Sequence, residues 1–114
     1  MIGIDIIQIS RMEKMINKFG ENALKRFLNP SEINLVKTPS SAAGFWAAKE
    51  AFGKALGTGI GKDCSFLDIE IKKTKKGKPF FSKETLKKFD LKNADLSISH
   101  DGNFAIAAVI LEKK

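Results

Sequence analysis

The sequence predicts an α+β fold, in which a small antiparallel sheet packs against one long helix and several short helices. Two observations indicate this class. Runs of helical patterns are followed by runs of strand patterns, and an alanine-rich helix over residues 42–56 is stronger than any other element. The chain has 114 residues, which suits one domain, so we expect a single domain over residues 1–114.

The chain opens with a strand and a helix. Residues 2–9 are rich in β-branched side chains and are predicted to form the strand. In the helix that follows, Ser10 is a candidate N-cap with Glu13 as its capping-box partner, and Gly20 ends the helix. Two stripes run along this helix: an apolar one of Met12, Met15, Ile16 and Phe19, and a basic one of Arg11, Lys14 and Lys18.

Two short helices and a long one come next. Residues 21–28 form the first short helix, and the turn at residues 29–32 opens the second. Residues 38–41 are predicted to be a loop before the long helix over residues 42–56, which the glycine-rich segment 57–61 stops. Because these glycines follow a helix and do not open one, we reject a Walker or Rossmann nucleotide loop.

The second half of the chain favours strands. Residues 66–72 alternate between apolar and charged side chains, as a half-buried strand does, and residues 72–78 form a basic turn. A short helix is predicted over residues 83–89, followed by a loop. Residues 96–111 form a hairpin that turns at residues 101–103. Its last strand, FAIAAVIL, is apolar on both faces, so we expect it to be central and covered on both sides.

Composition limits the class of protein. The chain has 20 Lys and Arg against 13 Asp and Glu, a formal charge of +7, which favours anionic partners without saying which kind. Its single cysteine, Cys64, can form no internal disulfide, which fits a reducing compartment. The opening residues do not resemble a secretory signal, and no stretch approaches the roughly 18 apolar residues that span a bilayer. We therefore expect a soluble, cytoplasmic protein that does not enter a membrane.

Three charged residues are candidates for chemistry. Asp5 interrupts an apolar strand, where a carboxylate needs an ion-pair partner or a metal ion, and both interpretations remain open. Glu50 and Lys54 lie four residues apart on one face of the long helix, either as a solvated pair or as part of a site. The small residues around them leave room for something to approach the helix: Ala47, Ala48, Ala51 and Gly53.

Other reactive side chains are sparse. His100 is the only histidine, and it follows the alternating hydroxyls of Ser97 and Ser99. This spacing does not make a nucleophile–base pair, and no G-x-S-x-G elbow is present. One cysteine and one histidine cannot build a structural zinc site.

Taken in order, these features resemble one family. Residues 3–6, GIDI, with Arg11 six residues after the aspartate, resemble the N-terminal signature of the holo-acyl-carrier-protein synthases. Residues 45–60, FWAAKEAFGKALGTGI, resemble the family's second signature, W/F-A-x-K-E-A-x-x-K-A-x-G-T-G. Residues 66–71, 77–79 and 97–100 are similar to its later blocks, so the resemblance covers essentially the whole chain.

The resemblance implies a 4′-phosphopantetheinyl transferase fold and a set of site residues. Asp5 and Glu50 would ligate Mg²⁺ together with the diphosphate of coenzyme A and water, which suits the preference of Mg²⁺ for oxygen ligands. Lys54 would contact the diphosphate, as a catalytic group beside the two carboxylates. The remaining residues assigned to coenzyme A by the same match are Lys49, Gly57, Gly77, Pro79 and His100, with the last three near the adenosine 3′-phosphate. Glu32 matches a family glutamate near the site.

The implied reaction is transfer of 4′-phosphopantetheine from coenzyme A to a serine of apo-acyl carrier protein, in fatty acid biosynthesis. The serine hydroxyl attacks the β-phosphate, and adenosine 3′,5′-bisphosphate leaves. A carboxylate takes the serine proton, directly or through water, and which carboxylate does so stays open. The nucleophile thus belongs to the partner, which fits the lack of a catalytic triad in this chain.

The resemblance also implies a homotrimer with its sites between neighbouring subunits. The basic stripe of Arg11, Lys14 and Lys18 would dock the acidic helix of the carrier protein. One departure from the family is Phe45, where relatives often have a basic residue, so a phosphate contact is either absent or made by another lysine.

Two rival interpretations are a small nucleic-acid-binding protein and an inactive scaffold of the same fold. Nucleic-acid binding would need aromatic residues interleaved with basic ones on an exposed face, whereas the phenylalanines here fall mostly on core stripes. The retained carboxylates and Lys54 argue against a scaffold. We therefore expect no nucleic-acid partner.

Overall fold

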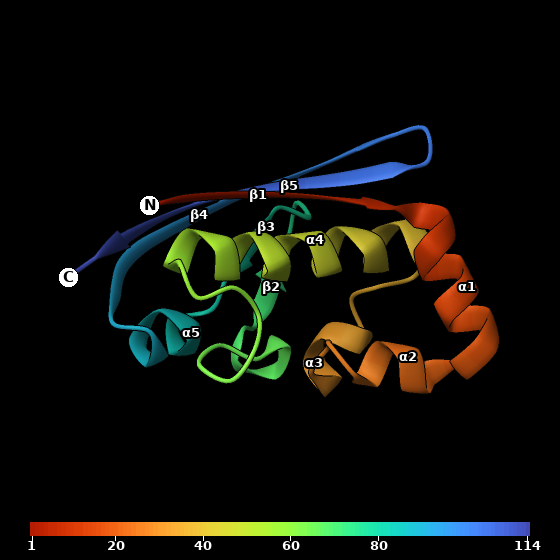
Figure 1. Ribbon diagram of the computed structural model, residues 1–114, viewed down its shortest axis with the longest axis horizontal. Coiled ribbons are helices and arrows are strands. Elements are labelled where there is room, and N and C mark those ends of the chain that lie inside the picture. The colour runs from red at the N-terminus through yellow and green to blue at the C-terminus, as the bar shows by residue number, and fades with distance from the viewer.

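Helix α4 (Pro39–Leu56) lies along one face of a three-stranded antiparallel sheet, and the other elements are arranged around this pair (Figure 1). The computed structural model describes all residues from 1 to 114. The strand order is β1 (Ile2–Gln8), β5 (Phe104–Lys113), β4 (Leu91–Asp101), so the apolar last strand is central, as predicted. The α+β class with a small antiparallel sheet is therefore confirmed.

The remaining elements surround the helix on its other sides (Figure 1). They are α1 (Ile9–Phe19), α2 (Glu21–Lys25), α3 (Pro30–Ile33), the 3₁₀ turn η1 (Phe66–Asp68), α5 (Lys83–Lys88), and a two-stranded sheet of β2 (Ile71–Lys73) and β3 (Pro79–Phe81). None of the helices has the length and apolar composition needed to cross a membrane.

Strand β1 packs directly on the backbone of α4, and Gly3 makes this possible. A Cβ atom at residue 3 would lie 2.0 Å from the carbonyl oxygen of Ala51 and 2.7 Å from the backbone nitrogen of Ala55. Only a residue without a side chain fits such an approach. The small residues of the long helix thus leave room for β1 itself, which brings Asp5 beside the helix.

Helix α1 is not capped by Ser10 and Glu13, so that prediction is wrong. Its N-cap is Gln8, which makes no side-chain cap bond. The hairpin turn satisfies the first amides instead: Ile9 N–H donates to the carbonyl oxygen of Asn103 (2.7 Å), and Ser10 N–H donates to Asn103 Oδ1 (2.9 Å). An acceptor from the other end of the chain replaces the local one.

Three other predicted boundaries are wrong. Residues 38–41 are not a loop, because Thr38 and Ser41 form a capping box that starts α4 at Pro39. Residues 66–72 are not one strand. Ser65 N–H donates to Asp68 Oδ2, which stabilises the turn η1 before β2 begins at Ile71. The expected loop after α5 is part of β4, which starts at Leu91 and pairs with β5 over most of its length.

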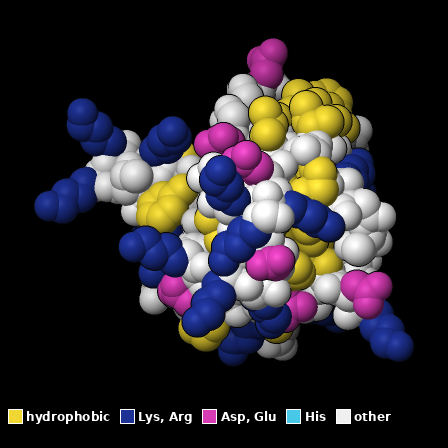
Figure 2. Space-filling model, turned by 90° about the vertical axis from the view of Figure 1, so that its left-hand side faces the viewer, with side chains coloured by type: hydrophobic (Ala, Val, Ile, Leu, Met, Phe, Trp, Pro, Cys, Tyr) yellow, Lys and Arg dark blue, Asp and Glu magenta, His cyan; other side chains and the backbone are white.

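The central strand is covered on one face only, which corrects the expectation that both faces are buried. On the inner face Ala105, Ala107, Val109 and Leu111 pack against the helix layer. On the outer face six large apolar side chains of β1 and β5 are between 36% and 73% exposed: Ile2, Ile4, Ile6, Phe104, Ile106 and Ile110. Figure 2 shows hydrophobic side chains gathered at the top of the molecule, where the sheet lies.

The only cysteine is fully buried, which predicts low reactivity. Burial raises the pKa of the Cys64 thiol to about 11, helped by the nearby Asp68 carboxylate and opposed by Lys88. At pH 8 about one thiol in a thousand is then a thiolate. We expect iodoacetamide to alkylate the native protein at least about 100-fold more slowly than the protein in guanidinium chloride. Equal rates, measured by mass spectrometry, would contradict this.

Candidate active site

Asp5 and Lys54 meet at the edge of the sheet, where β1 crosses α4. Lys54 Nζ donates to Asp5 Oδ1 (3.0 Å) and to the carbonyl oxygen of Ile4 (3.1 Å). The Asp5 side chain is 16% exposed, so an unpaired charge here would be costly, and the Lys54 ammonium offsets it. The ion pair explains how an apolar strand accommodates a carboxylate, and it leaves one Asp5 oxygen outside the pair.

Glu50 lies one turn before Lys54 on α4, and it responds to the charge of Asp5. Burial raises the pKa of the Glu50 carboxyl, and the Asp5 carboxylate raises it further, while Lys54 and Arg11 lower it. Two carboxylates that are distant in sequence therefore lie close enough to repel each other. Such a pair favours a bound cation or a shared proton.

The donor atoms at this place suit a magnesium ion held together with a phosphate ligand. The chain contains no group of three or more His, Cys, Asp or Glu that could hold a metal ion by itself. Asp5 and Glu50 supply hard oxygen donors, and Mg²⁺ is often bound by one or two carboxylates with the rest of its ligands from phosphate and water. The residues present fit Mg²⁺ on these terms.

A second candidate region is a cavity of about 180 Å³ between α4, the β2–β3 hairpin and β4. It brings together Gly77, Pro79 and His100, which the resemblance assigns to the same end of coenzyme A. His100 Nε2 lies 3.0 Å from the carbonyl oxygen of Ser40. Gly44 allows this close packing, because a Cβ atom there would lie 3.1 Å from His100 Nε2. The other residues around the cavity are Ser41, Phe45, Lys73 and Ile98.

Lys73 is a candidate binding residue that sequence reasoning missed. It lines this cavity, and its Nζ lies 5.6 Å from the centre of the Phe45 ring. The sequence shows five lysines between residues 72 and 78, and nothing in their spacing separates this one from the others. A basic group thus stands over Phe45, the position where the sequence lacks one.

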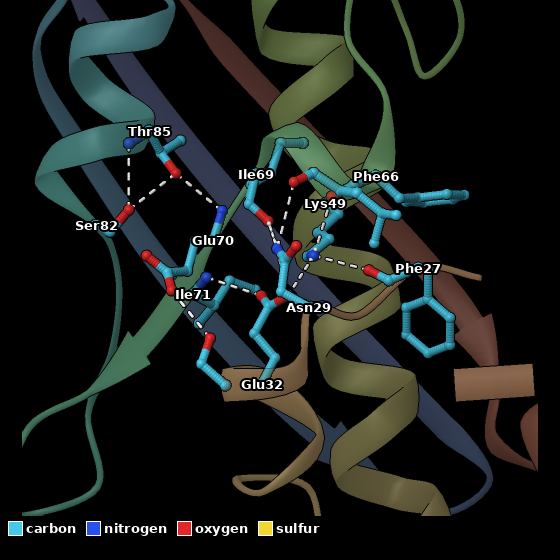
Figure 3. A network of polar contacts seen from close by, with 12 residues as sticks. Phe27, Asn29, Glu32, Lys49, Phe66, Ile69, Glu70, Ile71, Ser82 and Thr85 are labelled. Atoms are coloured by element: carbon cyan, nitrogen blue, oxygen red, sulfur yellow. Dashed lines mark hydrogen bonds and ion pairs between the residues drawn. The ribbon is translucent and has the colours of Figure 1, made fainter. Parts of the chain in front are cut away.

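Lys49 does not reach either region, so its assignment to coenzyme A contact is wrong. Its side chain is completely buried, and its Nζ donates to Glu32 Oε1 (2.7 Å) and to the carbonyl oxygens of Phe27 (2.7 Å) and Phe66 (3.0 Å). An ammonium has three N–H donors, and all three are used (Figure 3). Burial lowers the pKa of Lys49, and the Glu32 carboxylate opposes this effect. Glu32 is equally buried, away from solvent.

The two candidate regions lie on opposite flanks of α4. Asp5 belongs to β1 and His100 to β4, the two edge strands of the sheet. Gly44 and Glu50 are six residues apart on the helix, which places them about 120° apart around its axis. Gly57, which ends α4 in a left-handed conformation (φ 87°), follows Lys54 at the far end of the helix from the cavity. A single chain therefore does not bring all the predicted residues together.

The basic stripe of α1 is exposed along its length. Arg11, Lys14 and Lys18 are all on the surface. Arg11 is close enough to Glu50 to lower its pKa, so the stripe begins beside the carboxylates. Phe19 belongs to the apolar stripe of α1 but is 40% exposed, and the charged groups of Lys18 and Arg26 lie 5.2 Å and 4.8 Å from the centre of its ring.

Comparison with known proteins gives consistent results. The profile of the 4′-phosphopantetheinyl transferase superfamily matches residues 1–109. The chain is 75% identical over 113 residues to a holo-[acyl-carrier-protein] synthase of Nautilia profundicola, covering 99% of this chain and 100% of the relative. It is 56% identical to the enzyme of the same name from Aliarcobacter butzleri, with 100% of both chains covered.

Solved structures of proteins with the same name have the same fold as this chain. The fold matches that of Helicobacter pylori holo-[acyl-carrier-protein] synthase in complex with coenzyme A, with a TM-score of 0.91 and 50% identity over 98% of this chain and 100% of that one. It also matches a Bacillus anthracis holo-(acyl-carrier-protein) synthase in complex with coenzyme A (3′,5′-ADP), with a TM-score of 0.84 and 44% identity over 99% and 96% of the two chains.

Proposed function

The chain belongs to the 4′-phosphopantetheinyl transferase superfamily, and we propose that it transfers 4′-phosphopantetheine from coenzyme A to a serine of apo-acyl carrier protein. The products are holo-acyl carrier protein and adenosine 3′,5′-bisphosphate, and the reaction serves fatty acid biosynthesis. The observation that carries the proposal is the convergence of Asp5, Glu50 and Lys54 at the β1–α4 contact. Residues 1–114 together form the transferase domain.

The chain's own residues have separate roles in this proposal. Asp5 and Glu50 would hold Mg²⁺, which when bound offsets the charge of the diphosphate. Lys54 lies against Asp5 and is 53% exposed, so its ammonium can turn toward a phosphate oxygen and stabilise the charge that develops there. The carrier protein supplies the serine hydroxyl, and a carboxylate accepts its proton directly or through water.

The cavity on the other flank of α4 would take the adenosine 3′-phosphate end of coenzyme A. His100 and Lys73 supply basic groups there, and Gly77 and Pro79 form the turn on the hairpin side. Lys73 would make the phosphate contact that Phe45 cannot. Because this cavity and the carboxylates lie at opposite edge strands of the sheet within one chain, one coenzyme A would use the cavity of one subunit and Asp5, Glu50, Lys54 and Gly57 of a neighbour.

A homotrimer with sites between subunits fits this arrangement. The outer sheet face carries six exposed apolar side chains, and a patch of this kind is typical of an interaction site. A concavity of about 320 Å³ joins this face to the ion pair, because Ile4, Ile6 and Ile106 line it together with Asp5 and Lys54. A neighbouring subunit seated on the apolar face would therefore reach the catalytic groups.

One assay tests the proposed activity. The protein is incubated with coenzyme A, Mg²⁺ and apo-acyl carrier protein, and mass spectrometry follows the addition of phosphopantetheine to the carrier. Addition that requires a divalent ion supports the proposal. A carrier that stays unmodified with or without metal would defeat the enzyme assignment, and addition in the presence of EDTA would defeat the roles of Asp5 and Glu50.

Charge reversal on α1 tests the docking surface. Lys14→Glu with Lys18→Glu is expected to raise KM for the carrier protein about 10- to 100-fold, because charge complementarity steers and holds an acidic partner. KM for coenzyme A should change little. Arg11 is left intact because it also acts on Glu50.

A matched control uses the same spacing on another helix. Lys83→Glu with Lys87→Glu makes an equal charge change on exposed positions of α5, away from both candidate regions. This control should leave KM for the carrier protein nearly unchanged. If both double variants raise KM for the carrier protein equally, the effect comes from the net charge of the protein, and α1 is not the docking surface.

A further inference from the structure

The carboxylate of Glu32, on α3, pairs with Lys49 on α4 and also binds the segment that leads into the β2–β3 hairpin (Figure 3). Both side chains are completely buried. Glu32 Oε1 accepts from Lys49 Nζ (2.7 Å) and from Asn29 N–H (2.7 Å), while Oε2 accepts from the backbone N–H of Ile71 (2.8 Å). Ile71 is the first residue of β2, so the carboxylate spans from the helix to the start of the hairpin.

The same segment is held from its other side. Glu70 N–H donates to Thr85 Oγ1 (2.8 Å), and Ser82 N–H donates to the carbonyl oxygen of Glu70 (2.9 Å). Figure 3 shows Glu70 and Ile71 between these two sets of partners, with the Lys49 ammonium in contact with the Glu32 carboxylate. The path of the chain at residues 69–71 is therefore determined by buried polar bonds and not by apolar packing alone.

This path determines one wall of the cavity. Lys73 lies two residues after Ile71, and it lines the cavity with Gly77 and Pro79 of the same hairpin. The opposite wall includes Phe45, which lies one helical turn before Lys49 on α4. The ion pair thus connects the helix that carries one wall to the strand that carries the other.

A buried ion pair is poorly explained as a source of stability. Removing two charges from water is costly, and apolar residues of similar volume often stabilise a core as well or better. No buried side-chain polar atom of this protein lacks a hydrogen-bond partner, so the network is complete. A complete polar network restricts the arrangement of the segments that it joins.

We propose that Glu32 and Lys49 are positioning residues, which hold the β2–β3 hairpin at the distance from α4 that the nucleotide end of coenzyme A requires. This inference rests on the proposed function for the identity of the ligand. It predicts that weakening the pair lowers affinity for coenzyme A more than it lowers the rate of transfer.

The test uses Glu32→Gln and Lys49→Met, with Lys88→Met as the control. The Lys88–Asp68 ion pair ties the same segment to α5, but it is partly exposed. We expect each core variant to raise KM for coenzyme A about 10- to 100-fold, because small displacements of binding groups have large effects. Turnover at saturation and KM for the carrier protein should stay within about twofold. The control should change all three constants by less than about twofold.

Hydrogen exchange gives a readout that does not depend on activity. Backbone amides of residues 71–81 should exchange faster in Glu32→Gln than in the parent protein, while those of α4 should not. Unchanged exchange in the hairpin, or equal effects on the KM of both substrates, would overturn the inference. If Lys49→Met does not fold, Glu32→Gln carries the test. If the parent protein shows no transfer, the proposed function fails while the exchange experiment still decides the positioning role.

Discussion

Glu50→Gln is expected to reduce kcat by about a thousandfold while the protein remains folded. Glutamine keeps the size of the side chain and removes its charge. Glu50 is half-buried beside Asp5, and burial together with that neighbour raises its pKa. Its ionised form is therefore disfavoured in the free protein, and a cation bound between the two carboxylates would relieve their repulsion. Loss of this charge would weaken the proposed magnesium site, and the diphosphate would then lack its counter-charge during transfer.

The measurement is single-turnover transfer of phosphopantetheine over a range of Mg²⁺ concentrations, with thermal unfolding to verify the fold. Glu84→Gln, which removes an exposed carboxylate on α5, is the matched control and should retain full activity. A Glu50→Gln protein that keeps more than about a tenth of the parent kcat would contradict the ligand role.

Ile4→Glu is expected to dissociate the proposed homotrimer and to lower kcat/KM at least about 100-fold, because a site shared between subunits would lose its second subunit. The Ile4 side chain is 62% exposed in the single chain, so glutamate can be accommodated there without disturbing the core. In an assembly that buries this face, however, the new carboxylate would lose its water without gaining a partner.

Light scattering during size-exclusion chromatography measures the mass of the assembly, and the transfer assay measures its activity. Leu67→Glu is the matched control, since Leu67 is half-exposed in η1 and outside the outer sheet face. That variant should remain assembled and active. A parent protein that is already monomeric and fully active would contradict the shared site.

Periodicity in the sequence was sufficient to predict the elements whose alternation of apolar and polar side chains matches the alternation of buried and exposed positions. The strand over Ile2–Gln8, the long helix and the central position of the last strand follow from patterns of apolar residues. The predictions at Ser10 and over residues 66–72 failed for a different reason. Asn103 supplies the cap of α1 from the far end of the chain, and a local capping box interrupts an alternation that otherwise resembles a strand.

In the candidate site, too, some features follow from the local sequence and others depend on contacts with distant segments. Asp5 was a candidate because it interrupts an apolar strand, and Glu50 and Lys54 because they lie four residues apart among small side chains. Only the family resemblance placed the three residues in one site. Lys49 and Lys54 belong to one motif, but they are five residues apart and face different sides of α4, one toward Glu32 and one toward Asp5. Which side each faces depends on where β1 and η1 pack, and spacing alone does not contain that information. The same limit applies to Lys73 among its neighbouring lysines.

The pairing of the first strand with the last one has a consequence for biosynthesis. Residues Ile2–Gln8 pair with residues Phe104–Ile110, and the amino group of Met1 donates to the carbonyl oxygen of Leu111. A nascent chain leaving the ribosome therefore carries β1 without its neighbour until translation has almost reached the end of this sequence. Contacts between such distant segments form slowly, and unpaired apolar strands are prone to aggregate in the meantime. The segment that bears Asp5 is therefore synthesised well before the strand with which it pairs, and it can complete its sheet contacts only after that strand has emerged.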